Sequence, residues 1–144
     1  FPNNVLFGGG VNKMADRVRI AVVAPANRLT ESAADRVSAL ARANFGDRLR
    51  LDFHPQCFLC SGHFAGDDAA RSAAFLEAAN DPGAAAVWFA RGGYGSGRLD
   101  DALFAKLNQH ARRKTYLGYS DLGFLLARLH GDGIGRSVHG PMAA

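Results

Sequence analysis

The chain has 144 residues, 48% hydrophobic and 21% charged, which predicts one globular domain with a packed core and excludes a disordered or fibrous protein. Its formal net charge is +4, but the basic residues are interleaved with acidic ones and form no stripe, so we expect no nucleic-acid partner. No apolar run approaches the roughly 18 residues that span a bilayer, and the first residues lack a secretory signal. We therefore expect no membrane association and a cytoplasmic location.

Residues 1–13 differ in character from the rest of the chain. Residues 7–10 (Phe-Gly-Gly-Gly) are typical of a linker, and Met14 stands immediately before the first apolar run. We interpret residues 1–13 as a cloning remnant or an extension, and residues 14–144 as the folded domain.

From residue 18 onward, apolar β-branched runs alternate with segments of helical periodicity. The runs predict strands at residues 18–24, 49–53, 84–90, 115–119 and 137–139. Helices are predicted at residues 30–45, 67–79, 98–109 and 121–130, and Thr30 and Asp67 cap the first two. This alternation is typical of an α/β fold with an open, mostly parallel sheet and helices on both faces, a Rossmann- or flavodoxin-like three-layer sandwich.

Two cysteines and two histidines lie close together after the second predicted strand: His54, Cys57, Cys60 and His63. Zinc sites use such ligands, but structural sites separate two ligand pairs by a longer connector than this segment has. Small buried thiols in a loop explain the cysteines more simply. We expect no metal and no cofactor.

Residues 91–97 (Arg-Gly-Gly-Tyr-Gly-Ser-Gly) follow the third predicted strand. Ligands of parallel sheets bind beyond the carboxyl ends of the strands, and glycines let backbone N–H groups approach an anion closely. The glycine order matches neither a dinucleotide-binding fingerprint nor a Walker A loop. A tight turn that needs glycine for its geometry alone explains this segment equally well.

Ser120 stands where the fourth predicted strand turns into a helix, which is the arrangement of a nucleophile elbow. In an elbow, the N–H of the following residue contributes to the oxyanion hole. The pattern is incomplete, because Leu122 occupies a position where the full motif has glycine. Serine is also a favoured helix cap, and the turn alone favours that role.

A nucleophilic serine needs a base within hydrogen-bonding reach. Two of the five histidines, His110 and His130, stand near predicted helix C-termini, where the helix dipole explains them. His139 ends a predicted strand and is the one histidine expected near Ser120. No histidine is clearly a base, so either the base comes from elsewhere or the turn is not catalytic.

Several short motifs, in order along the chain, carry a resemblance to a known family. They are residues 22–25 (Val-Val-Ala-Pro), 62–66 (Gly-His-Phe-Ala-Gly) with the helix start at 67–71, 90–99 around the glycine turn, 118–121 (Gly-Tyr-Ser-Asp) and 139–142 (His-Gly-Pro-Met). Together these motifs resemble the LD-carboxypeptidase family, the muramoyltetrapeptide carboxypeptidases and their microcin C resistance relatives. The resemblance covers residues 17–142.

The resemblance implies that Ser120 is the catalytic nucleophile and that Ser96 is a turn residue. The N–H groups of Asp121 and Gly93 would form the oxyanion hole, with Gly92 and Tyr94 in the same substrate-binding turn. The Glu and His of the triad belong to a C-terminal domain that this chain does not include.

The implied reaction is metal-independent hydrolysis of an L,D-amide that releases D-alanine from murein tetrapeptide. On this interpretation the partners are the murein peptide and the C-terminal domain, and the present chain alone is inactive. Apolar surface left uncovered by that domain predicts self-association into a homo-oligomer. Two alternatives stay open: a noncatalytic module that binds a carboxylate or phosphate, and a related peptidase that cleaves peptide–nucleotide antibiotics.

Overall fold

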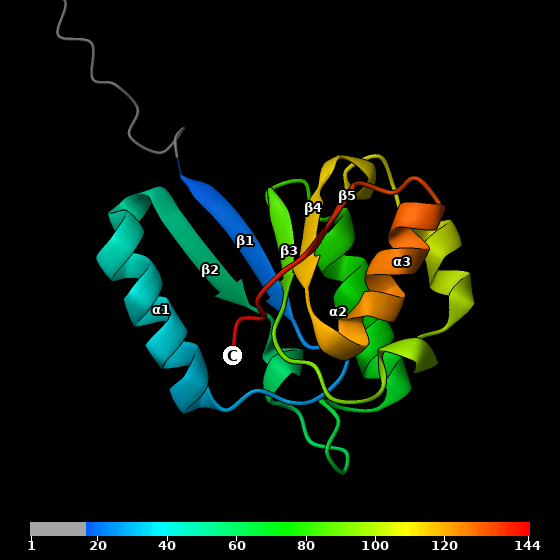
Figure 1. Ribbon diagram of the computed structural model, residues 1–144, viewed down its shortest axis with the longest axis horizontal. Coiled ribbons are helices and arrows are strands. Elements are labelled where there is room, and N and C mark those ends of the chain that lie inside the picture. Colours follow the sequence, from blue (N-terminus) through cyan, green and yellow to red (C-terminus); the bar gives the residue numbers. More distant parts are fainter. Residues whose placement is uncertain (1–16) are drawn as a thin grey trace, which may run out of the picture.

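The computed structural model describes residues 17–144, and the interpretation of residues 1–13 lies outside them. Five parallel strands form one sheet in the order β2-β1-β3-β4-β5 (Figure 1). The strands are β1 (Val18–Val23), β2 (Leu49–Phe53), β3 (Ala86–Phe89), β4 (Thr115–Gly118) and β5 (Arg136–His139). The helices are α1 (Glu31–Phe45), α2 (Asp68–Asn80) and α3 (Gly123–Gly131). No helix in residues 17–144 is long and apolar enough to cross a membrane.

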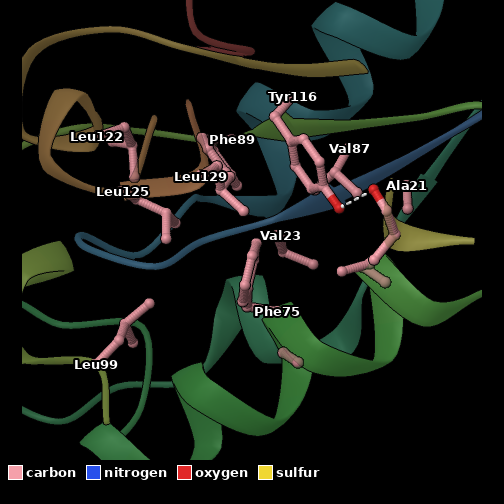
Figure 2. Packing of buried hydrophobic residues seen from close by; sticks show 14 of the residues in the cluster. Ala21, Val23, Phe75, Val87, Phe89, Leu99, Tyr116, Leu122, Leu125 and Leu129 are labelled. Atoms are coloured by element: carbon pink, nitrogen blue, oxygen red, sulfur yellow. Dashed lines mark hydrogen bonds between the residues drawn. The ribbon is translucent and has the colours of Figure 1, made fainter. Parts of the chain in front are cut away.

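The helices cover both faces of the sheet, which confirms the predicted α/β fold class. Figure 1 shows α1 on one side of the strands and α2 with α3 on the other. Strand β1 is buried between these layers: Val23 packs with Phe75 of α2 in one core, shown in Figure 2, and Val22 packs with Ala33 of α1 in a second core. A strand covered on both faces needs apolar side chains on both of them, which accounts for the hydrophobic run over residues 20–24 that follows Arg19.

Two helices begin at the capping residues predicted from the sequence. The Thr30 hydroxyl accepts a hydrogen bond from the Ala33 N–H at 3.2 Å, at the start of α1. The Asp67 carboxylate accepts one from the Ala70 N–H at 2.7 Å, at the start of α2. Each side chain satisfies one of the N–H groups that a helix start leaves free.

The helix predicted at residues 98–109 is wrong. The chain forms separate 3₁₀ turns there, Ser96–Arg98, Asp101–Lys106 and Ala111–Arg113. Asp100 is extended and accepts the Ala102 N–H, while the Asn108 side chain accepts the N–H of His110, so side chains replace helical hydrogen bonds at both ends. The apolar spacing that suggested a helix serves burial instead, because Leu99, Leu103 and Leu107 all enter the core.

The strand order places three loops at one edge of the sheet. The sheet grows from β1 toward β2 on one side and from β3 toward β5 on the other, so the strand order reverses between β1 and β3. In parallel sheets, ligands bind outside the carboxyl ends of the strands at such a switch point. The loops that follow β1, β3 and β4 therefore meet at this edge. They carry the glycine turn, residues 91–97, and Ser120.

The last residues also return to this edge. The N–H groups of Ala143 and Ala144 donate to the carbonyls of Phe89 and Ala90 at the end of β3. The indole N–H of Trp88 donates to the Pro141 carbonyl at 2.8 Å. This segment, red in Figure 1, thus closes the α1 side of the sheet beside β3.

Candidate active site

Ser120 has a backbone conformation that serine rarely adopts. Its φ is +58°, and it is the only residue other than glycine with positive φ in residues 17–144. The side chain is exposed at the end of β4. Non-glycine residues in this region are strained, and such strain is concentrated at functional sites.

The Ser120 hydroxyl does not cap the helix that follows. The chain forms a short 3₁₀ turn, Ser120–Leu122, and then enters α3 without a side-chain cap on either segment. The capping alternative left open by the sequence is therefore not realised. The N-terminal end of this helical segment lies directly behind Ser120, where its dipole favours negative charge.

The glycine turn lies against Ser120. A Cβ atom added at Gly92 would lie 3.1 Å from the Ser120 Cβ and 3.1 Å from the Met142 Sδ. Such contacts are tighter than nine in ten real Cβ contacts, so a side chain at Gly92 would force its neighbours to move by a few tenths of an ångström. The absence of a side chain lets the two loops approach each other.

Two hydrogen bonds join the glycine turn to the turn that contains Ser120. The Ser96 N–H donates to the Asp121 carboxylate at 2.8 Å, and the Ser96 hydroxyl donates to the Asp121 carbonyl at 2.6 Å. Ser96 is buried, and both of these bonds hold the turn in place. The Asp121 carboxylate thereby fixes the spacing between the two turns.

The backbone N–H groups of Gly93 and Asp121 remain available in this arrangement. Neither donates to a backbone carbonyl in the loops of residues 17–144. Gly93 has φ of +115°, a conformation that favours glycine. Two free N–H groups on adjoining turns beside an exposed hydroxyl can stabilise an oxyanion that forms next to that hydroxyl.

A fully buried arginine on α2 holds the glycine turn at Gly95, the residue next to Ser96. The Arg71 guanidinium donates to the Pro25 carbonyl at 3.1 Å and to the Gly95 carbonyl at 3.2 Å, so it links the loop after β1 to the turn after β3. It also pairs with the Asp68 carboxylate and stacks on the Phe64 ring. Hydrogen bonding from Arg98, with the charge of Arg71, holds the pKa of Asp68 below its ordinary value.

Tyr94 lies at the open side of the site. It is 63% exposed, and its ring centroid lies 6.3 Å from that of Phe64. A surface pocket of about 340 Å³ is lined by Tyr94, Gly95, Gly97, Arg98, Asp121 and Phe124. The structure therefore brings all five predicted site residues to one edge of the sheet.

His139 does not pair with Ser120. It lies at the end of β5, opposite Gly118 of β4, and its ring centroid is 5.0 Å from that of Tyr119. No hydrogen bond joins the His139 ring to Ser120 within residues 17–144. The described part of the chain thus presents the serine and the N–H donors without a base bonded to the hydroxyl.

The side chains of the Cys/His segment have separate partners. His54 contacts Glu77, the Cys57 thiol donates to the Val22 carbonyl, and the Cys60 thiol donates to the Gly62 carbonyl. Burial raises the pKa of the Cys57 thiol to about 12. In residues 17–144 no three His, Cys, Asp or Glu side chains are grouped so that they could hold a metal ion.

Two residues at the site were not predicted from the sequence. Arg71 belongs to the helix-start motif, but nothing in its spacing indicates that it reaches the glycine turn. Asn27, in the loop after β1, lies in no recognisable motif, and its side chain packs on Gly93. Both contacts join segments far apart in the chain, so no local pattern could predict them.

Comparison with known proteins agrees with this geometry. Residues 20–140 match the model of the LD-carboxypeptidase N-terminal domain. The chain belongs to the LD-carboxypeptidase family. This LD-carboxypeptidase domain is 31% identical over 132 residues to the murein tetrapeptide carboxypeptidase of Pseudomonas aeruginosa, an alignment of 87% of the chain and 39% of the relative. It is 37% identical over 82 residues to a probable murein peptide carboxypeptidase of Bacillus subtilis, covering 56% of the chain and 25% of that relative.

Solved structures show the same fold. Muramoyltetrapeptide carboxypeptidase from Oxalobacter formigenes superposes with a TM-score of 0.72 at 30% identity, covering 88% of the domain and 40% of that chain. An MccF-like protein from Bacillus anthracis superposes with a TM-score of 0.70 at 21% identity, covering 89% of the domain and 39% of that chain. The LD-carboxypeptidase domain described here thus spans less than half the length of these relatives.

Proposed function

We propose that this chain is the nucleophile-bearing domain of a serine carboxypeptidase that hydrolyses an L,D-amide bond and releases D-alanine from murein tetrapeptide. Membership of the family and the names of its murein-directed relatives support the substrate class. The strained, exposed Ser120 beside Gly92 is the observation that carries the proposal. A serine needed only for a turn would have no reason to occupy a glycine-like conformation.

In the proposed reaction, the Ser120 hydroxyl attacks the carbonyl carbon of the scissile amide. A base takes the hydroxyl proton, and the N–H groups of Gly93 and Asp121 donate to the tetrahedral oxyanion. Collapse of this intermediate breaks the C–N bond, and the base passes its proton to the departing amine of D-alanine. Water then cleaves the acyl-enzyme ester and restores the hydroxyl.

The base and its orienting carboxylate are assigned to a part of the protein beyond this chain. The family resemblance implies a His and a Glu there, and the geometry around His139 provides no substitute for them. Loss of the base from a serine triad lowers turnover by roughly four orders of magnitude or more. We therefore expect negligible D-alanine release from the present chain alone.

A fusion protein tests this proposal. Residues 17–144 would replace the matching part of the Oxalobacter carboxypeptidase, and circular dichroism and thermal melting would verify folding. We expect the fusion to release D-alanine from murein tetrapeptide. Ser120→Ala should lower this rate at least 10³-fold. Ser38→Ala, on α1 away from the site, is the matched control and should leave the rate unchanged.

The outcome also separates catalysis from binding alone. A folded fusion that binds the tetrapeptide but releases no D-alanine would contradict the peptidase proposal and favour a noncatalytic binding module. Equal rates for the unchanged fusion and its Ser120→Ala variant would show that another residue is the nucleophile. Robust turnover by the isolated chain would contradict the assignment of the base to a further domain.

A further inference from the structure

Asn27 has a buried polar atom for which the fold provides no partner. Its Oδ1 is the one buried side-chain nitrogen or oxygen without a hydrogen bond in residues 17–144. Native structures leave few such atoms, because a buried acceptor without a donor costs stability. An unsatisfied atom of this kind therefore calls for a functional explanation.

The carboxamide of Asn27 lies directly on the proposed oxyanion turn. A Cβ atom added at Gly93 would meet the Asn27 side chain at 2.2 Å from Nδ2 and 2.7 Å from Oδ1. Gly92, the preceding residue, lies against Ser120 in the same way. The turn is thus enclosed between Ser120 on the β4 side and Asn27 on the β1 side.

The backbone of Asn27 is fixed by the neighbouring segments. Its N–H donates to the Gly92 carbonyl at 3.4 Å, and it forms an antiparallel bridge with Phe64. On either side, Ala26 accepts the Ala65 N–H and Arg28 donates to the His63 carbonyl. The side chain is therefore held at the site while its hydrogen-bonding capacity stays unused.

A purely structural role does not explain an amide at this position. An apolar side chain of similar size would fill the space over Gly93 without leaving an acceptor unsatisfied. A carboxamide carries one acceptor and two donors, the complement of a peptide group, which offers one N–H and one carbonyl. A small rotation about the Cβ–Cγ bond would turn these atoms toward a chain bound across the turn.

We propose that Asn27 is a substrate-contact residue, whose carboxamide hydrogen-bonds a peptide group of the substrate next to the scissile amide. This inference rests on the proposed function, because it assumes that a peptide lies across Gly93 with its reacting carbonyl toward Ser120. It adds a specificity element from the loop after β1. On this basis a bound peptide contacts Ser120 on one side of the glycine turn and Asn27 on the other.

The test uses the full 144-residue chain, labelled with ¹⁵N and titrated with murein tetrapeptide. We expect the Asn27 side-chain NH₂ signals to shift with the same dissociation constant as the backbone amides of Gly93 and Asp121. Asn27→Ala should weaken binding about tenfold, the loss typical of a hydrogen bond to a buried group. Its melting temperature should stay equal or rise, because the unsatisfied acceptor is removed.

Asn44→Ala is the matched control. The Asn44 side chain donates to the Leu40 carbonyl on α1, away from the site, so this change should leave tetrapeptide affinity unaltered. A fall in melting temperature for Asn27→Ala without a change in affinity would show a structural role and overturn the inference.

The signals of the unchanged chain separate two kinds of failure. If the Gly93 and Asp121 amides shift while the Asn27 side chain does not, the inference alone is overturned. If none of the three responds to the tetrapeptide, the proposed function fails, and the inference fails with it. This readout needs no variant, so it holds even if Asn27→Ala does not fold.

Discussion

At the scale of single residues, the backbone of Ser120 sets the geometry of the site. A positive φ brings the Cβ of an L-residue close to its own backbone, which glycine avoids. Ser120 is exposed at the end of β4, and its Cβ lies beside Gly92. Position 120 thus combines two demands that oppose each other: a backbone suited to glycine and a side chain that carries an oxygen.

Two substitutions at position 120 isolate the effect of the strained backbone conformation on the free energy of unfolding. Ser120→Gly and Ser120→Ala both remove the hydroxyl, but only glycine relieves the positive φ. We expect the glycine variant to be more stable than the alanine variant by about 1 kcal/mol. Urea denaturation at equilibrium measures this difference.

The same pair at Ser38, within helix α1, provides the control. Alanine should be the more stable of the two there, again by about 1 kcal/mol, because glycine is a poor helix former. The difference in stability between the glycine and alanine variants should therefore have opposite signs at positions 120 and 38. The same sign at both positions would contradict the strained conformation of Ser120.

The sequence indicated Ser120 and the glycine turn because both belong to local motifs at strand ends. Their mutual contact could be expected from parallel strand topology alone, which brings all carboxyl ends to one edge. Asn27 gave no such signal. Its importance arises from packing against Gly93, a residue that becomes its neighbour only when β1 and β3 pair.

At the scale of elements, the second half of the glycine turn is held by two adjacent tethers. Arg71 bonds to the Gly95 carbonyl and to the Pro25 carbonyl, and the next residue, Ser96, bonds to Asp121. A turn rich in glycine would otherwise sample many conformations. The tethers give its N–H groups a fixed direction before any ligand arrives.

Removal of the Arg71 tether should be costly. Arg71→Met keeps most of the buried volume but removes the guanidinium donors from the buried Pro25 carbonyl and from the Gly95 carbonyl, which keeps only the Arg98 N–H. We expect a loss of roughly 2–4 kcal/mol in the free energy of unfolding, together with broadened or shifted amide signals for Gly93. Arg71→Lys should recover only part of this stability, because one ammonium cannot reproduce the planar fork of the guanidinium.

Arg98→Met is the comparison for this experiment. Arg98 also bonds to Asp68, but its side chain is 51% exposed. Its loss should cost less than about 1 kcal/mol, as is typical of exposed ion pairs. Similar costs at the two positions, measured by urea denaturation, would show that Arg71 is not the main tether.

Residues 98–109 form 3₁₀ turns in place of the predicted helix because side chains compete for the backbone N–H groups. Leu99, Leu103 and Leu107 have helical spacing, yet Asp100 and Asn108 offer their side chains to nearby N–H groups. These local bonds compete with helix formation. All three leucines are buried, whereas the backbone path depends on the polar residues between them.

At the scale of the whole molecule, the edge that carries the site is also apolar. Tyr94, Tyr119 and Phe124 are 63%, 52% and 70% exposed there. Large apolar side chains gathered at one edge commonly mark an interface. Because the chain spans less than half of its relatives, this edge is where we expect a further part of the protein, or a second copy, to pack.

We predict that the chain alone self-associates through this edge. Sedimentation velocity over a range of concentrations should show a species larger than a monomer. The double variant Tyr119→Ser with Phe124→Ser should shift the population toward monomer by reducing the apolar area available for burial. Leu40→Ser, on α1 and also 63% exposed, should have little effect. A clean monomer at every concentration of the unchanged chain would contradict this prediction.

The strand order has a consequence for biosynthesis. Strand β1 leaves the ribosome first, yet it lies inside the sheet and pairs with β2 on one edge and β3 on the other. Until residue 89 has been translated, one edge of this apolar strand is open to pairing with other nascent chains. Translation of β2 alone therefore does not protect β1, and both of its edges can be paired only once β3 has been translated.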